Sequence, residues 1–281
     1  MLKSFLFCLF LIIPLSLVSI PAPYESGAGE SKATQTNQRV NESLHEKCLY
    51  PTVKVQSIDG RASGSGVIIK SKKIKEKQYI NVVLTCAHVL LDDMKYNILQ
   101  GKYQNWSEFV GYEKPTACDV YYKNNFKDIA VLLFLSDKEL PTAKLGLKEN
   151  VYIGNKVFKM GCGGDALFAS PPRMDKGIIT SIFNLGNEFK IIRTSAFTVP
   201  GDSGGPLYQD NKLIGLIRAI RILNGKVLAY KISFAISIDV ITSLDKELNN
   251  ALSFIYNDEY KTPVIPAYRL QFDRYERIID L

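Results

Sequence analysis

The segment Gly201-Asp202-Ser203-Gly204-Gly205-Pro206-Leu207 sets one serine among glycines. Glycine lets a backbone turn tightly, so several N–H groups can point toward one place beside that serine. Such a place can stabilise a developing oxyanion, and losing one donor typically costs on the order of 10² to 10³ in rate. Ser203 is therefore a candidate nucleophile, although a lone serine in such a turn is ordinarily only turn chemistry.

A nucleophilic serine requires a base elsewhere in the chain, because its hydroxyl is a weak nucleophile at its own pKa. The chain has two histidines. His45 lies in a polar stretch, whereas His88 ends an apolar run, 82–87, that is typical of a buried strand. Asp128 stands before a second apolar run and can orient the imidazole. Alone, His88 is explained as a core histidine and Asp128 as a solvated turn residue, but with Ser203 they indicate a triad.

In the order His88, Asp128, Ser203 the chain resembles serine proteases of the chymotrypsin and trypsin fold, which use the order His, Asp, Ser. The resemblance spans about residues 50–245, and Ser233-Phe234-Ala235-Ile236 is similar to the bacterial HtrA-type branch, without a PDZ-sized segment after it. Three motifs carry the resemblance: Thr85-Cys86-Ala87-His88-Val89, Asp128-Ile129-Ala130-Val131 and the serine segment.

The resemblance implies an all-β fold of two six-stranded antiparallel barrels, followed by a C-terminal helix, with the triad between the barrels. It implies a serine endopeptidase in which Ser203 attacks protein or peptide substrates, His88 moves the proton and Asp128 orients His88. The N–H groups of Gly201 and Ser203 would form the oxyanion hole. No cofactor or metal is implied, and the chain has no Cys-x-x-Cys pair. The alternative is a trypsin-fold binding or scaffold protein, against which the complete set of three residues argues.

The same resemblance gives expectations for substrate binding. It places Phe197 at the base of the specificity pocket, beside Thr198, and makes the strand Leu216–Ile220 one wall, with Arg218 on it. An aromatic ring offers no countercharge to a buried Lys or Arg. We therefore expect cleavage after small or medium apolar residues, with Arg218 able to admit an acidic side chain.

The chain departs from the animal digestive enzymes in two places. Val89, and not a cysteine, follows His88, so the usual disulfide beside the histidine is not expected. No Ile-Val-Gly-Gly segment precedes His88 to supply a new amino terminus for Asp202. Either Asp202 has a different cation or donor, or the domain needs no proteolytic activation.

Composition along the chain predicts four parts: a signal peptide or membrane anchor (1–20), a polar linker or propeptide (21–47), the protease domain (48–256) and a C-terminal tail (257–281). Met1-Leu2-Lys3 and the apolar run Phe5–Ile13 have the pattern of a signal peptide. This predicts a secreted, extracytoplasmic protein, with attachment to a membrane as the alternative. After Cys8, four cysteines remain, which allow disulfides or free buried thiols.

Short apolar runs separated by turns predict the strands, and a net charge of +7 is spread along the chain. The basic run 70–77 should be a solvated hairpin tip, and no nucleic-acid partner is expected. Asn224-Gly225 predicts a two-residue hairpin, and apolar spacing over 241–255 predicts a helix. The expected strands are 50–56, 64–69, 79–89 and 128–135 in the first barrel, and 151–160, 176–183, 188–196, 212–223 and 226–237 in the second.

Overall fold

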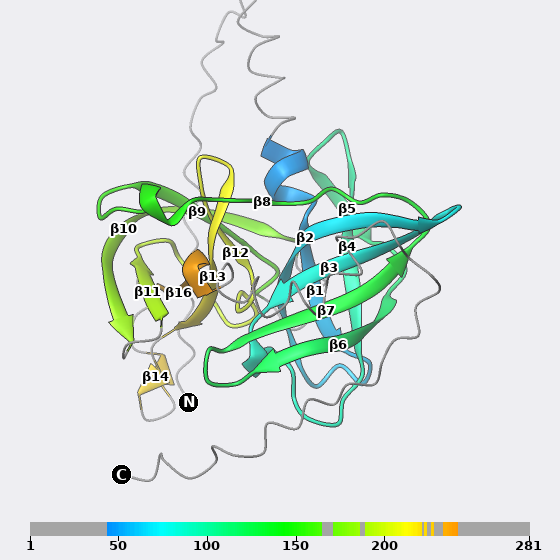
Figure 1. Cartoon of the computed structure of the whole chain (residues 1–281), viewed down its shortest axis with the longest axis horizontal. Helices are drawn as coiled ribbons and strands as arrows, with labels where there is room; N and C mark the ends of the chain where they lie inside the picture. The colour runs from blue at the N-terminus through cyan, green and yellow to red at the C-terminus, as the bar shows by residue number, and fades with distance from the viewer. Residues whose placement is uncertain are drawn as a thin grey trace, which may run out of the picture. The chain divides into compact units, whose positions relative to one another are not determined.

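The computed structural model describes residues 44–164, 171–185, 189–220, 222–223, 226–227 and 233–240. Its strands form two closed six-stranded antiparallel barrels, as expected (Figure 1). The predicted signal peptide, most of the linker, the C-terminal tail and the predicted helix over 241–255 lie outside the described residues. Among the described residues, no helix has the length and apolar character needed to cross a membrane.

The first barrel is a ring in the order β1-β2-β3-β7-β6-β4, closed by pairing of β1 with β4. A further strand, β5, extends β4 as a hairpin. A short helical turn, η1 (His45–Leu49), precedes the barrel. The strands are β1 (Thr52–Ser57), β2 (Ser63–Lys75), β3 (Gln78–Thr85), β4 (Tyr96–Gln104), β5 (Glu108–Tyr112), β6 (Thr116–Asn124) and β7 (Ile129–Ser136).

The second barrel is a ring in the order β12-β9-β10-β11-β16-β13, closed by pairing of β12 with β13. The short strand β8 (Lys144–Leu145) adds to β13 in parallel, and η3 (Lys148–Asn150) follows β8. The ring strands are β9 (Lys156–Gly161), β10 (Arg173–Leu185), β11 (Phe189–Thr194), β12 (Pro206–Gln209), β13 (Lys212–Ile220) and β16 (Ser233–Ser237).

Most predicted strands are present, and the differences have local causes. The expected strand 79–89 is too long, because β3 ends at Thr85 and the chain turns into η2 (Ala87–Val89). Strands β4, β5 and β6 were not expected, since their sequences alternate with many exposed polar residues and show no continuous apolar run. The predicted two-residue hairpin is confirmed by pairing of β14 (Ile222–Leu223) with β15 (Lys226–Val227).

The apolar runs that predicted β3 and β7 supply the centre of the first barrel. Val82, Val83 and Leu84 are buried, as are all residues of the run 129–134. The core continues into the second barrel through residues such as Met160 and Leu216. Burial of these side chains on strands from both barrels holds the chain segments that carry the candidate site.

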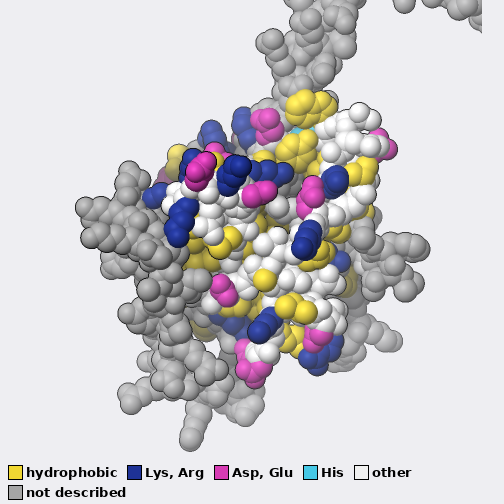
Figure 2. Space-filling model, turned by 90° about the vertical axis from the view of Figure 1, so that its right-hand side faces the viewer, with side chains coloured by type: hydrophobic (Ala, Val, Ile, Leu, Met, Phe, Trp, Pro, Cys, Tyr) yellow, Lys and Arg dark blue, Asp and Glu magenta, His cyan; other side chains and the backbone are white. Residues whose placement is uncertain are grey.

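The four described cysteines, Cys48, Cys86, Cys118 and Cys162, are free thiols, so the free-thiol alternative holds for them. The basic run forms the β2–β3 hairpin, whose end, 75–77, is exposed as expected. On the face of the molecule in Figure 2, basic and acidic side chains are interspersed.

Candidate active site

His88 lies in the tight turn η2, directly after β3. The turn is closed by backbone hydrogen bonds from Val89 N to Cys86 O (3.2 Å) and from Leu90 N to Ala87 O (3.0 Å). On its far side, Lys123 Nζ donates to Leu90 O at 2.8 Å. Ala87 and Val89 are buried on either side of His88, whose side chain is 48% exposed. The turn therefore presents the imidazole to solvent from a rigid strand end.

Asp128 occupies the last position of the turn between β6 and β7. Lys127 N donates to Asn124 Oδ1 at 2.8 Å, which fixes the turn. Asp128 has φ +53°, a left-handed conformation that costs most residues energy and that Asp tolerates better than most. Its side chain is only 6% exposed. A strained backbone and a buried carboxylate at one position are typical of functional sites.

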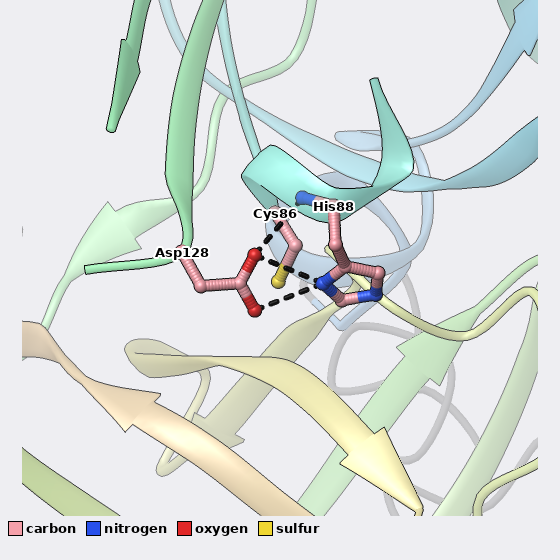
Figure 3. Close-up of side chains that lie close together, drawn as sticks. All are labelled: Cys86, His88 and Asp128. Atoms are coloured by element: carbon pink, nitrogen blue, oxygen red, sulfur yellow. Dashed lines mark hydrogen bonds and ion pairs between the residues drawn. The ribbon is translucent and has the colours of Figure 1, made fainter. Parts of the chain in front are cut away.

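The Asp128 carboxylate and the His88 ring face one another (Figure 3). His88 Nδ1 lies 2.9 Å from Asp128 Oδ1 and 2.8 Å from Oδ2, and His88 N donates to Oδ1 at 3.0 Å. An ionised carboxylate can only accept, so the ring proton must lie on Nδ1. The other ring nitrogen points away from Asp128 and is left as a base.

Arg218, on β13, supplies a third contact to the same carboxylate. Its Nε donates to Asp128 Oδ2 at 2.9 Å, and the Arg218 side chain is 31% exposed. Burial raises the pKa of the Asp128 carboxyl, but the hydrogen bonds from His88 and the charges of His88 and Arg218 outweigh burial. The net effect lowers the pKa of Asp128, which keeps it ionised at neutral pH.

Ser203 lies in the turn before β12, and its hydroxyl points at a main-chain acceptor. Ser203 Oγ donates to Arg218 O at 3.1 Å. Among the described residues there is no hydrogen bond between Ser203 Oγ and the His88 ring, so the hydroxyl must rotate before His88 can take its proton. Such bonds are often long or absent in unliganded sites and form with substrate.

The backbone before Ser203 has the shape expected of an oxyanion site. Gly201 has φ +92°, and a Cβ there would come within 2.9 Å of the Gly163 Cα atom. Its carbonyl is turned away, accepting from Ser65 Oγ at 2.7 Å. Within the described part of the chain, neither Gly201 N nor Ser203 N has an acceptor. Both N–H groups are thus available to a ligand oxygen.

Gly204 brings the serine turn against the histidine turn. A Cβ at Gly204 would overlap Ser65 O and Thr85 Oγ1 and would lie 3.0 Å from Cys86 N. Ser65 N also donates to Ser203 O at 2.8 Å. The second-barrel turn that carries Ser203 therefore rests directly on strands β2 and β3 of the first barrel.

Asp202 is fully buried, and its cationic partners are side chains of the same domain. It therefore has a different cation in place of the new amino terminus that the animal digestive enzymes use. Lys159 Nζ, from β9, pairs with Asp202 Oδ2, and Arg173 Nη2, from β10, lies 3.0 Å from the same oxygen. Gly163 N donates to Oδ1 at 3.0 Å and Val199 N to Oδ2 at 2.9 Å. These contacts hold the residue next to Ser203 without an amino terminus.

The residues expected to bind substrate are placed as follows. Phe197 is 39% exposed, and the guanidinium carbon of Arg173 lies 5.6 Å from its ring centroid. Thr198 is buried, and its hydroxyl accepts from Ser233 Oγ. The Arg218 guanidinium is engaged by Asp128.

Ligand atoms of Cys86, His88 and Asp128 lie within 4.8 Å of one another, a spacing that a metal ion could use. Burial, with the nearby Asp128 charge, raises the pKa of the Cys86 thiol well above its ordinary value. The thiol donates to Ile217 O at 3.3 Å. A metal ligand must be a thiolate, so this donor set fits a metal poorly.

Residues 64–216 match the family model described as "Trypsin-like peptidase domain". The chain belongs to this family. Among curated proteins, this chain is similar to a probable periplasmic DegP-like serine endoprotease of Halomonas elongata, with 30% identity over 72% of this chain and 38% of that protein. A Pseudomonas putida protein of the same description is 30% identical over 68% of this chain and 35% of its own length. A putative Do-like protease 14 of Arabidopsis thaliana is 27% identical over 66% and 41%. The chain thus spans about two fifths of these relatives.

Sequence reasoning placed three residues of this trypsin-like peptidase domain at one site, and the structure brings them together around Arg218. It missed the ion pair of Arg218 with Asp128, because strand periodicity does not say which side chain crosses between barrels. It also missed Ser65, Lys159 and Arg173. The available signal was Lys159, a charged residue between the apolar residues Phe158 and Met160.

Proposed function

We propose that the chain is a serine endopeptidase that hydrolyses peptide bonds through an acyl-enzyme. Ser203 attacks the scissile carbonyl, His88 takes the proton through the ring nitrogen that faces away from Asp128, and Asp128 holds the ring. Gly201 N and Ser203 N stabilise the oxyanion. The observation that carries this proposal is the His88–Asp128 pair, at 2.8–2.9 Å, beside a serine turn with two free N–H groups.

An active-site serine probe tests this proposal. A fluorophosphonate should add once to the folded chain, at Ser203, as read by intact mass and peptide mapping. Ser203→Ala should lose both the adduct and peptidase activity, whereas Ser107→Ala, at an exposed serine, should keep both. A folded chain that forms no adduct and cleaves no peptide library would instead support the binding or scaffold alternative.

The substrate class is proposed from the pocket residues. An exposed aromatic ring at Phe197 and a guanidinium at Arg218 that is already paired both favour small or medium apolar side chains before the cut. Profiling on a peptide library tests this, and a dominant preference for Lys or Arg at that position would contradict it.

The proposed location is outside the cytoplasm. The signal-like segment Met1–Ile13 supports it, and the curated relatives of H. elongata and P. putida are named as periplasmic. Attachment to a membrane through residues 1–20 is the alternative. Fractionation of cells that express the full chain, compared with a chain lacking residues 1–20, separates export from retention.

A further inference from the structure

Arg218 contacts two residues of the proposed triad, Asp128 and Ser203. Its guanidinium Nε lies 2.9 Å from Asp128 Oδ2, and its carbonyl accepts from Ser203 Oγ at 3.1 Å. The side chain is two thirds buried, so the ion pair is partly shielded from solvent. Only the side-chain contact can be removed by substitution, because every residue supplies the carbonyl.

All acceptor positions of Asp128 are directed by its neighbours. Oδ1 faces His88 N and Nδ1, and Oδ2 faces His88 Nδ1 and Arg218 Nε. A carboxylate held by donors on two sides cannot rotate away from the imidazole. Arg218 on β13 therefore fixes, from the second barrel, a carboxylate that the first barrel supplies.

The charge of Arg218 also acts on the imidazole. Asp128 places a negative charge against the ring, and the Arg218 guanidinium places a positive charge on the same carboxylate. Within the described residues, the other titratable group in this cluster is the Cys86 thiol, which is neutral at neutral pH because burial raises its pKa. Asp128 contacts the ring and Arg218 is paired with Asp128, whereas Lys123, whose Nζ reaches Leu90 O in the same turn, is paired with Asp92.

We propose that Arg218 is a positioning residue for the reaction: its guanidinium fixes the Asp128 carboxylate against His88, and its positive charge balances the charge of that carboxylate beside the ring. This inference rests on the proposed peptidase function. Its readout is the pH dependence of the reaction, because a neutral ring is the form that accepts the serine proton and removing Arg218 leaves the Asp128 charge unbalanced.

The pH dependence of kcat/KM tests the inference. In Arg218→Gln, the pH at which kcat/KM reaches half its plateau should rise by about one unit relative to wild type. Arg218→Lys keeps the charge and should stay within about 0.3 unit of wild type. Arg61→Gln removes an exposed arginine that is paired through Nε with Asp59, so it is a matched control and should not move the profile. A half-plateau pH in Arg218→Gln that is unchanged or lower would overturn the inference.

A second measurement keeps the inference separate from the proposed function. In the Ser203→Ala protein, ring protonation can be followed by NMR, and the two histidines allow His45 to serve as the internal reference. Adding Arg218→Gln should move the protonation midpoint of His88 upward while that of His45 stays in place. Arg218→Met, which keeps the apolar stem, carries the same expectation if Arg218→Gln does not fold. If the protonation midpoint of His88 does not move, the inference is wrong even where the wild type is an active peptidase. An absence of peptidase activity in the wild type would contradict the proposed function but not this inference.

Discussion

Asp128 holds the His88 ring in the proposed mechanism. Its carboxylate fixes the His88 tautomer, and an amide at this position presents an N–H group or a weaker acceptor to Nδ1. We predict that Asp128→Asn lowers kcat by about 10⁴, because an imidazole in the wrong tautomer cannot take the serine proton, with a much smaller change in KM. Asp119→Asn, at an exposed carboxylate on β6, is the control. Steady-state kinetics on one peptide substrate measure kcat and KM of both variants. A decrease in kcat of less than tenfold in Asp128→Asn would show that Asp128 has no part in the mechanism.

Gly204 shows how one residue position is fixed by close packing. It has φ +83°, and a Cβ there would overlap Ser65 O and Thr85 Oγ1. Gly60 has φ +75° but has open space around its Cβ position. Gly204→Ala and Gly60→Ala both place an alanine at a positive φ. The difference between their losses of stability therefore measures the cost of the steric overlap at Gly204.

Gly204→Ala should therefore destabilise the chain by about 1–3 kcal/mol more than Gly60→Ala does. Denaturant unfolding measures the two free energies. Equal losses of stability would mean that the serine turn can move away from β2 and β3.

Strands β9 and β10 carry the buried charges beneath the serine turn. Lys159 and Asp202 are both fully buried, and Lys159 also lies 3.2 Å from Asp175, so removing Lys159 leaves Arg173 as the one described cationic partner of the buried Asp202 carboxylate. We predict that Lys159→Met lowers the free energy of unfolding by up to about 3–5 kcal/mol. Lys156→Met, on the exposed side of β9, is the matched control and should change it little.

The double variant Lys159→Met with Asp202→Asn completes the test. It removes the buried carboxylate charge that has lost Lys159, so it should recover part of the stability that Lys159→Met loses. Arg173→Gln should cost less than Lys159→Met, because the Arg173 side chain is 33% exposed and Asp202 keeps Lys159. A double variant no more stable than Lys159→Met would show that the lysine stem, and not its charge, matters.

Strands with several buried apolar residues could be predicted, and β4, β5 and β6, in which exposed polar residues are frequent, could not. The apolar runs 82–87 and 129–134 predict β3 and β7. These runs are continuous because both faces of the strands are buried there. β12 has only four residues and follows the serine turn at once, so no pattern has room to appear. Contacts such as Arg218 with Asp128 or Lys159 with Asp202 join residues 90 and 43 positions apart. They depend on how strands are ordered in each ring, which one sequence does not encode locally.

The two barrels are held together by packing and hydrogen bonds between segments far apart in the chain. Ser65 on β2 joins Gly201 O and Cys162 N, and Cys86 after β3 donates to Ile217 O on β13. The site is formed only when both barrels are folded, because His88 and Asp128 come from the first and Ser203 from the second. Loss of either barrel should therefore abolish activity completely.

The reactivity of the buried thiols depends on how well both barrels are packed. Burial raises the pKa of Cys48, Cys118 and Cys162 to about 12, against an ordinary value near 8.5. Since only the thiolate reacts with iodoacetamide, alkylation of these cysteines at pH 8 should be on the order of 10³ slower in the folded chain than in the unfolded chain. Ser107→Cys, at an exposed position of the first barrel, provides a thiol that should react at the rate of the unfolded chain.

Mass spectrometry of the alkylated peptides measures each rate separately as denaturant is added. If the barrels unfold together, Cys48 in front of the first barrel and Cys162 after β9 should become reactive at the same denaturant concentration. The hydrogen bonds between the barrels and the core that continues from the first barrel into the second favour this outcome, because neither barrel can open without exposing apolar surface of the other. Reaction of Cys162 at a clearly lower denaturant concentration than Cys48 would instead show that the second barrel, with Ser203, unfolds by itself.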